Sequence, residues 1–239
     1  NGVANSSVKR GDLSVMIGGA CAYNGISGNS VAIGALAGTT NPPSEGTVCI
    51  GFNAGSGTSS SVKTKSVQIG DSSNNAGGDY SQAYGVNAAA TGVSAIAVGA
   101  GAQAQGVGSI GIGGRYNGGA SYGALGTKSI VIGDGTALNA AVEEGAVVIG
   151  ASAALSGAGE DIIIIGNLAN SANATDQAIC LNATGVNLAA VASSLVIKPI
   201  AIGSNSDLGT IKRPADTNFD HYLAYNATTG EIRAVLHGG

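Results

Sequence analysis

The sequence is poor in large side chains. Its 239 residues include no Trp, two Phe and one Met, whereas 41 are Gly. A compact domain of this length normally fills a thick core with Leu, Phe, Trp and Met. The hydrophobic residues present are mostly Ala, Val and Ile, so any core must be thin. The composition therefore predicts an elongated molecule.

Charge is also scarce, because only 10% of the residues are charged and the net charge is −4. Binding to nucleic acid or to an anionic membrane surface depends on dense positive charge. The longest aliphatic run, Ile162 to Ile165, is too short to cross a bilayer. We therefore expect no nucleic-acid partner and no insertion into a membrane.

Residues that carry chemistry are few and scattered. Cys21, Cys49 and Cys180 show no CxxC spacing and have no His at ligand spacing, so small buried hydrophobes are expected there. His221 and His237 have no nucleophile motif beside them. We expect no catalytic residue, no cofactor and no metal site, and hence no enzymatic activity.

Two further patterns imitate functional sites. The neighbouring acidic pairs at 143–144 and 160–161 precede aliphatic runs, and adjacent strand residues point to opposite sides, which disfavours a shared acid–base site. The stretch GVGSIGIGG imitates a dinucleotide fingerprint, but no helical pattern follows it. The acidic pairs are predicted to lie in turns, and the glycines of GVGSIGIGG to belong to the repeat.

What the sequence has in abundance is a short repeat. A run of aliphatic residues ends in Gly, a segment of small residues follows, and the run returns after 14 to 20 residues. A helical repeat needs more than about 30 residues, so the period predicts one coil of a β-solenoid. The runs are SVMIG (14–18), SVAIG (30–34), TVCIG (47–51), SVQIG (66–70), SQAYG (81–85), AIAVG (95–99), SIGIG (109–113), SIVIG (129–133), AVVIG (146–150) and IIIIG (162–166), with weaker echoes at 178–182 and 199–203.

Strand alternation assigns the faces of each run. Val31 and Ile33 share one face, while Ser30 and Ala32 share the other. We expect the aliphatic pair to be buried inside the coil, with Ala, Ser and Gly outside, and the closing Gly to adopt positive φ. Segments 87–92 and 101–106 carry a second, weaker strand signal. One such coil buries too little to be stable alone, so lateral association with other chains is expected.

The runs, followed by small-residue segments of the type AxAxG, resemble the head repeats of trimeric autotransporter adhesins of the YadA-like kind. The likeness is most literal from Tyr84 to Gly114, good over 12–166 and looser over 167–203. It implies a left-handed parallel β-roll, three of which pack side by side as an elongated homotrimer that serves attachment. The implied division is an N-terminal extension (1–11), the head repeats (12–203) and a C-terminal hairpin, tip or connector (204–239).

The C-terminal segment departs from that family. A neck, a heptad-patterned stalk and a membrane-anchoring barrel do not follow the repeats. The segment YLAYNATTGEIRAV predicts a strand, a turn at Asn226 to Gly230 and a strand. It resembles the ending of fibre and surface proteins of phages and large DNA viruses, which implies an extracellular place on a virion or cell surface.

Contact residues are expected where loops interrupt the repeat. Tyr is a favoured recognition residue, and Tyr80, Tyr84, Tyr116 and Tyr122 lie in or beside the longest insertions, although each could equally fill a gap between subunits. Four glycosylation sequons occur, at Asn5, Asn173, Asn182 and Asn226.

The sequence thus favours a non-enzymatic structural attachment protein, most consistent with a virion or phage fibre. Its expected partners are further copies of itself, a host glycan or protein receptor, and other fibre or virion proteins at its ends. Two alternatives stay open: a bacterial adhesin head, and a surface filament that binds no receptor. An ice-binding solenoid is less well supported, because the ladders are not regular in Thr.

Overall fold

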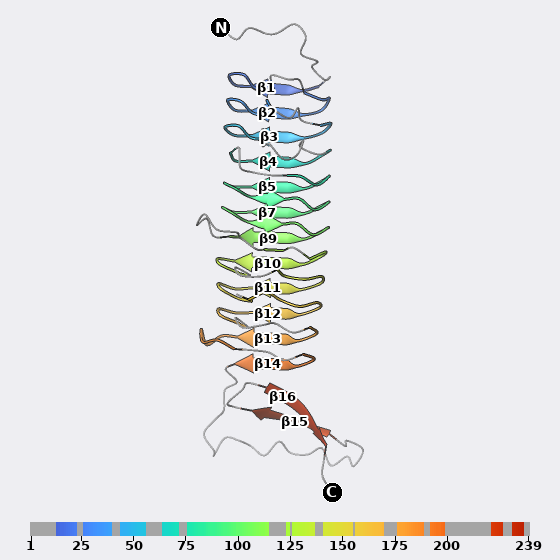
Figure 1. Ribbon diagram of the computed structural model, residues 1–239, viewed down its shortest axis with the longest axis vertical. Coiled ribbons are helices and arrows are strands. Elements are labelled where there is room, and N and C mark those ends of the chain that lie inside the picture. Colours follow the sequence, from blue (N-terminus) through green and yellow to red (C-terminus); the bar gives the residue numbers. More distant parts are fainter. Residues whose placement is uncertain are drawn as a thin grey trace.

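A computed structural model describes thirteen segments of the chain, which form a tall stack of short strands (Figure 1). For residue 198 and the last two segments only the backbone is described. The segments are 13–22, 26–39, 44–55, 64–71, 76–114, 123–124, 126–136, 141–154, 156–169, 176–188, 192–198, 221–226 and 231–236.

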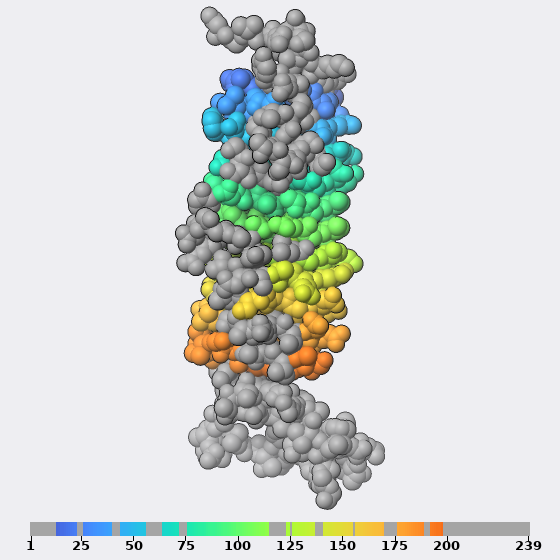
Figure 2. Space-filling model, viewed as in Figure 1, coloured from blue at the N-terminus to red at the C-terminus, as the bar shows by residue number. Residues whose placement is uncertain are grey.

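Twelve strands form one parallel ladder, with one strand from each coil. They lie across the long axis of the molecule, and successive coils follow one another along it as layers (Figure 2). The described residues contain no helix, so the predicted all-β parallel solenoid is confirmed. The ladder strands are β1 (Val15–Ile17), β2 (Val31–Ile33), β3 (Val48–Ile50), β4 (Val67–Ile69), β5 (Gln82–Tyr84), β7 (Ile96–Val98), β9 (Ile110–Gly113), β10 (Ile130–Gly133), β11 (Val147–Ile149), β12 (Ile163–Ile165), β13 (Ile179–Asn182) and β14 (Leu195–Lys198).

The strands stay in register despite coils of unequal length. Val31 pairs with Val15 on one side and Val48 on the other, and Ile33 pairs in the same way with Ile17 and Ile50. β-branched residues favour a pleated strand, which suits a run of only three residues. Insertions therefore lengthen the connections between strands and leave the ladder unchanged.

The residues of each ladder strand alternate between two faces as predicted. The face that carries the Val and Ile pair points outward, however, and the other face points into the coil. From β2 to β14 the middle residue of each ladder strand, such as Ala32, Cys49 or Val148, is buried inside the coil, whereas Met16 in β1 is half-buried. The Val and Ile on either side are half-buried or exposed, so the prediction of an aliphatic pair inside the coil is wrong. The coil is too narrow for two large side chains, and Ala fills its interior instead.

Ser or Thr before the strand has a structural role in several coils. Thr47 Oγ1 donates a hydrogen bond to Ser44 O at 2.8 Å, and Ser109 Oγ donates to Gly106 O at 2.8 Å. These bonds satisfy the carbonyl of the turn three residues earlier, which lies inside the molecule. The polar residue that opens a run such as SVAIG or SIGIG therefore belongs to the core.

The closing glycine adopts positive φ, as predicted. At Gly85, φ is +129°, and an added Cβ would lie 2.7 Å from the carbonyl oxygen of Gly99 in the next coil. Such a backbone conformation is rarely adopted by other residues, and the approach of the next coil leaves no room for a side chain. The stack of glycines thus fixes both the turn and the spacing of coils.

A second short sheet faces the ladder in the middle of the molecule. It contains β6 (Ala89–Ala90) and β8 (Gln103–Ala104), which fall in the segments predicted to carry the weaker strand signal. Isolated bridges continue this sheet through Ala124, Val142 and Ala158. In the coils of β6 and β8 only small side chains lie between the two backbones.

The C-terminal end of the ladder is covered by a hairpin. β15 (His221–Asn226) and β16 (Glu231–Leu236) pair in antiparallel fashion, which confirms the predicted pair of strands. β16 also pairs with β14 in antiparallel fashion, through Leu195 with Ile232. The described pairings of β1 are with β2 alone, so the two ends of the ladder differ.

Candidate interaction surface

The outward face of the parallel sheet is the most distinctive surface of the molecule. We name its side chains the aliphatic ladder, defined as the first and third residues of each of the twelve parallel ladder strands except β5. All of them are Val, Ile or Leu, and none is charged. They are Val15, Ile17, Val31, Ile33, Val48, Ile50, Val67, Ile69, Ile96, Val98, Ile110, Ile112, Ile130, Ile132, Val147, Ile149, Ile163, Ile165, Ile179, Leu181, Leu195 and Ile197.

Most of these side chains have aliphatic neighbours in both adjacent coils. All of them nevertheless stay at least partly exposed. Ile17 is 58% exposed at the N-terminal end, and Ile165 is 41% exposed near the other end. With strands about 4.8 Å apart, the ladder is roughly 50 Å long and on the order of 500 Å² in area. Contiguous apolar patches of this size on a soluble protein mark interaction sites.

One coil interrupts the aliphatic ladder with polar groups. In β5 the outward residues are Gln82 and Tyr84, and Tyr84 Oη donates a hydrogen bond to Gln82 Oε1 at 2.9 Å. Gln82 lies in register between Val67 and Ile96. The structure thus places Tyr84 within the sheet face, in the run SQAYG (81–85) that follows the predicted insertion.

Tyr80 occupies a different surface, the turn that precedes β5. Its side chain is 53% exposed, its backbone is left-handed with φ at 60°, and Lys65 Nζ lies 5.8 Å from its ring centroid. A cation at that distance from an aromatic ring is attracted to it. Tyr80 and Tyr84 lie at opposite ends of β5 and do not form one patch, while Tyr116 and Tyr122 lie outside the described residues.

Acidic residues occupy equivalent positions in the turn before the strand of successive coils. This alignment joins residues of different coils, so comparing residues adjacent in the sequence does not reveal it. Glu144, Glu160 and Asp176 occupy equivalent positions in three successive coils. Asp176 Oδ1 accepts a hydrogen bond from the backbone N of Glu160 at 3.1 Å. Asp79 Oδ1 accepts one from the backbone N of Thr64 at 3.0 Å. These aspartates therefore satisfy backbone amides of the preceding coil, which accounts for their presence without a ligand.

The four predicted sequons have different positions. Asn182 is buried, and its amide nitrogen donates to Asn167 O at 3.0 Å and to Val186 O at 2.7 Å. Thr184 of the same sequon donates to Asn182 Oδ1 at 2.6 Å. Both amide hydrogens are thus engaged, and in the folded chain Asn182 is a turn residue that presents no acceptor for a glycan. Asn226 lies in β15, and Asn5 and Asn173 lie outside the described residues.

The cysteines fill interior positions, as expected. Cys49 and Cys180 are fully buried middle residues of β3 and β13, and Cys21 is half-buried. Burial raises the pKa of the Cys49 thiol to about 12, and the nearby Cys21 contributes in the same direction. Burial also raises the pKa of Cys21. A protonated, buried thiol is a poor nucleophile, so Cys49 acts as a small apolar side chain.

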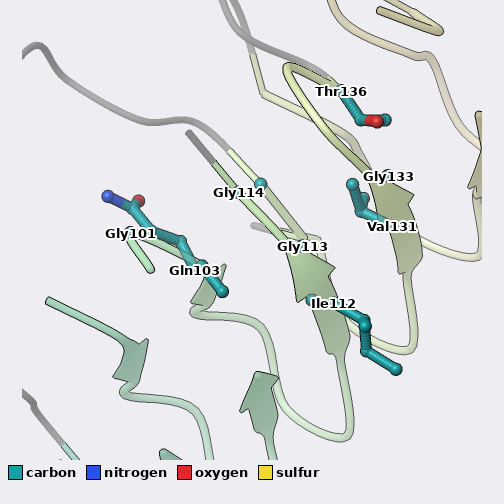
Figure 3. Close-up of a pocket in the computed structure, with 11 residues that line it drawn as sticks. Gly101, Gln103, Ile112, Gly113, Gly114, Val131, Gly133 and Thr136 are labelled. Atoms are coloured by element: carbon teal, nitrogen blue, oxygen red, sulfur yellow. The ribbon is translucent and has the colours of Figure 1, made fainter. Parts of the chain in front are cut away.

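A small cavity lies between β8, β9 and β10, lined by Gln103, Gly113, Val131 and Thr136 among others (Figure 3). Its volume is about 20 Å³, enough for about one water molecule. Gly111 creates this narrow region, because a Cβ there would collide with the backbone oxygen of Gln103. The cavity is a packing gap that is too small for a substrate.

The described part of the chain was also searched for other kinds of site. It holds no group of three or more His, Cys, Asp or Glu arranged to bind a metal ion. Within the same residues, no helix has the length and apolar character that a membrane span requires. The aliphatic ladder remains the surface whose exposure most needs an explanation.

Known proteins give no independent guide to this surface. Comparison of the chain with protein-family models, with curated proteins and with solved structures finds no match. The function must therefore be argued from the geometry of the coils.

Proposed function

We propose that this chain is a non-enzymatic structural attachment protein. In this proposal three copies pack side by side as left-handed β-rolls, forming an elongated homotrimeric head or fibre. It lies outside the cell, on a virion or phage fibre, and displays repeated surfaces to a host cell. Other fibre or virion proteins adjoin its ends.

The observation that carries the proposal is the exposed aliphatic ladder. Sheets made of parallel strands occur almost only with both faces covered, yet here one face is packed on Ala and the other is open. Burying an uncharged aliphatic face away from water lowers the free energy in proportion to the area that is covered. The ladder therefore needs a partner that is equally long and equally apolar.

A second copy of the chain meets this requirement directly. Every ladder strand except β5 presents an aliphatic pair, and the spacing of the pairs is set by hydrogen bonding along the ladder. Two such faces have the same period and can interlock over their whole length. The resemblance of the repeats to YadA-like heads favours three copies, whose ladders would meet at a common axis.

Attachment then falls to the surfaces that point away from that axis. In each coil the turns carry exposed residues, among them Tyr80 beside Lys65 and the acidic positions Glu144 and Glu160. Three chains that repeat such turns would offer many weak contacts to a glycan or protein receptor. Linked weak contacts sum to an avidity far above that of one contact.

A surface filament without a receptor is the alternative from another functional class. It requires both ends of the ladder to join further copies, but β16 pairs with β14 in antiparallel fashion at one end. An end occupied in this way cannot continue the parallel stack. This arrangement favours a head with one finished end, of viral or bacterial origin, over an open filament.

Light scattering combined with electron microscopy tests the assembly. We expect the mass of three chains and a rod-shaped outline for the parent. Ile132→Asp, in the aliphatic ladder, should reduce the mass to one chain, whereas Ala151→Asp on an exposed turn should leave it unchanged. A parent of single-chain mass would contradict the proposal.

Attachment itself is tested on a glycan array with the same variants. We expect the parent to bind a subset of glycans and Ile132→Asp to bind them at least about 10-fold more weakly, because avidity is lost. Ala151→Asp is the matched control for added charge. End-to-end polymers of the parent that bind no glycan and no cell would instead support the filament.

A further inference from the structure

The aliphatic ladder has a weakness as an interface between copies. Its pairs repeat at every coil, so sliding one chain by a single coil, about 4.8 Å, brings equivalent side chains together again. Such a slip loses only one layer of contact at the end. Aliphatic contacts alone therefore do not define the axial alignment of copies, just as uniform strands define register poorly.

The pair in β5 breaks this periodicity. Among the twelve strands of the ladder, β5 is the only one whose outward residues are not aliphatic. Tyr84 Oη donates to Gln82 Oε1 at 2.9 Å, which holds the two polar groups together on the sheet face. Both side chains are half-buried already in the single chain. Covering the face would remove the rest of their water.

The Gln82 amide has hydrogen-bonding capacity that its own chain does not use. Within the described residues, its Oε1 accepts the Tyr84 hydroxyl, and its Nε2 group has no acceptor. A buried amide without a partner costs about 1 to 3 kcal/mol. When copies align coil for coil, the Gln82 and Tyr84 oxygens of a neighbouring chain come to the same height and can accept those hydrogens. A slip of one coil would instead oppose the amide to Val67 or Ile96.

The position of β5 also distinguishes parallel from antiparallel packing. β5 is the fifth of twelve strands, so in a fully overlapped antiparallel pair it would face the eighth, β10. There Ile130 and Ile132 offer no hydrogen-bonding group. Among fully overlapped arrangements, only parallel packing in register brings polar pair against polar pair, and an antiparallel pair would have to give up three layers of contact to do so.

We propose that Gln82 and Tyr84 form a polar layer that aligns copies of this chain in parallel and in register. The inference rests on the proposed self-association through the aliphatic ladder and adds how that association is made specific. A single buried polar layer fixes register in coiled coils at a cost in stability, by the same competition between satisfied and unsatisfied amides.

The test is a distance measurement between spin labels by double electron–electron resonance. The label is placed on the exposed turn at Ala151→Cys in a Cys21→Ala background, because Cys49 and Cys180 are buried. In the parent we expect one narrow distance, since copies aligned in register carry their labels at one height. In Gln82→Val with Tyr84→Ile we expect the assembly to persist but the distances to spread over steps of about 4.8 Å.

A rescue variant separates the layer from other effects of the substitutions. Adding Val67→Gln and Ile69→Tyr to the apolar variant moves the polar layer by one coil in every copy. The copies should again align, and the single narrow distance should return. Circular dichroism and light scattering verify the fold and mass of each variant.

The outcomes distinguish this inference from the proposed function. A narrow, unchanged distance in the apolar variant, or a broad distribution in an assembled parent, overturns the polar layer and leaves self-association standing. A parent of single-chain mass overturns both. A narrow distance in the parent, broad in the apolar variant and narrow again after rescue, supports the polar layer.

Discussion

The coils around β5, β7 and β9 hold only small side chains in their interior, whereas those around β10, β11 and β12 hold larger ones. We call these regions the narrow part and the wide part. In the narrow part the strands recur every 14 residues, and the buried cluster is made of Ala alone. In the wide part the coils are longer, and Val131, Val148 and Ile164 occupy the equivalent interior positions. The outward residues are aliphatic in both parts, apart from β5. The interior thus adapts to the length of each coil, while the outer face keeps one chemistry.

The largest effect on stability is expected when a large side chain is removed from the interior of the wide part. Ile164→Ala should lower the free energy of unfolding by about 3 kcal/mol, because it leaves a cavity in a fully buried position. Ile164→Val is the matched control and should cost about 1 kcal/mol. Chemical denaturation measures both, and a loss below that of the control would show that the wide interior collapses around small residues.

The reverse change overfills the narrow part. Ala83→Ile should lower the free energy of unfolding by about 2 kcal/mol, because the facing backbone leaves no room for a larger side chain. Ala100→Ile, on an exposed turn, adds the same atoms without burying them. Equal stability of the two variants in thermal or denaturant unfolding would mean that the narrow coils can widen.

The smallest expected effect concerns Cys49, which occupies an interior position that Ala32 fills in the preceding coil. Its pKa is about 12 in the folded chain against an ordinary value of 9.0, so the folded state keeps the proton at a pH where the unfolded chain releases it. Stability from this group is therefore complete below pH 9 and falls as the pH rises toward 12. At pH 10 the loss should be about 1 kcal/mol relative to pH 7.5.

Cys49→Ala isolates that titration from the other groups that titrate at alkaline pH. Denaturation curves of the parent and of Cys49→Ala at pH 7.5 and pH 10 should differ by this contribution. The native thiol should also react with a thiol reagent at pH 8 far more slowly than the same thiol in the unfolded chain. An identical pH dependence of the two proteins would argue that Cys49 is accessible to water.

The solenoid could be predicted from sequence because its signals are local and repeated. The closing glycines mark the coils of the first ten ladder strands, from β1 to β12, and the alternation in a run such as Val31, Ala32, Ile33 separates two faces. The hairpin at 221–236 was recognisable by the same means, two strand patterns around a turn. These features depend on residues within one or two turns of chain.

The direction of the faces could not be obtained in that way. Alternation states that Ala32 and Val31 point apart, and the hydrophobicity of Val suggested the interior. What decides the matter is the distance between the ladder and the opposite side of the coil, visible where Gly111 approaches the backbone of Gln103. A 14-residue coil with two turns leaves little room for side chains between its strands. The short repeat was therefore the signal in the sequence that Val and Ile must point outward.

The candidate surface was only partly accessible to sequence reasoning. Tyr84 was selected for its residue type, and alternation places it on one face with Gln82, but the position of this pair between Val67 and Ile96 depends on the register of strands many residues apart. The hydrogen bonds of Asp79 and Asp176 likewise join successive coils whose lengths differ. The proposed partners, the trimer and the location stay predictions until the experiments above are done.

The orientation of the hydrogen bonds has a mechanical consequence. The strands lie across the long axis, so the bonds that join β1 to β2, and each later neighbour, run along it. A pull on the two ends of the chain loads these bonds one coil after another, as in opening a zipper, and never the whole sheet in shear. Each coil released would lengthen the rod by roughly 50 Å, since an extended chain spans about 3.4 Å per residue. Such a rod would yield in small steps under tension and dissipate force.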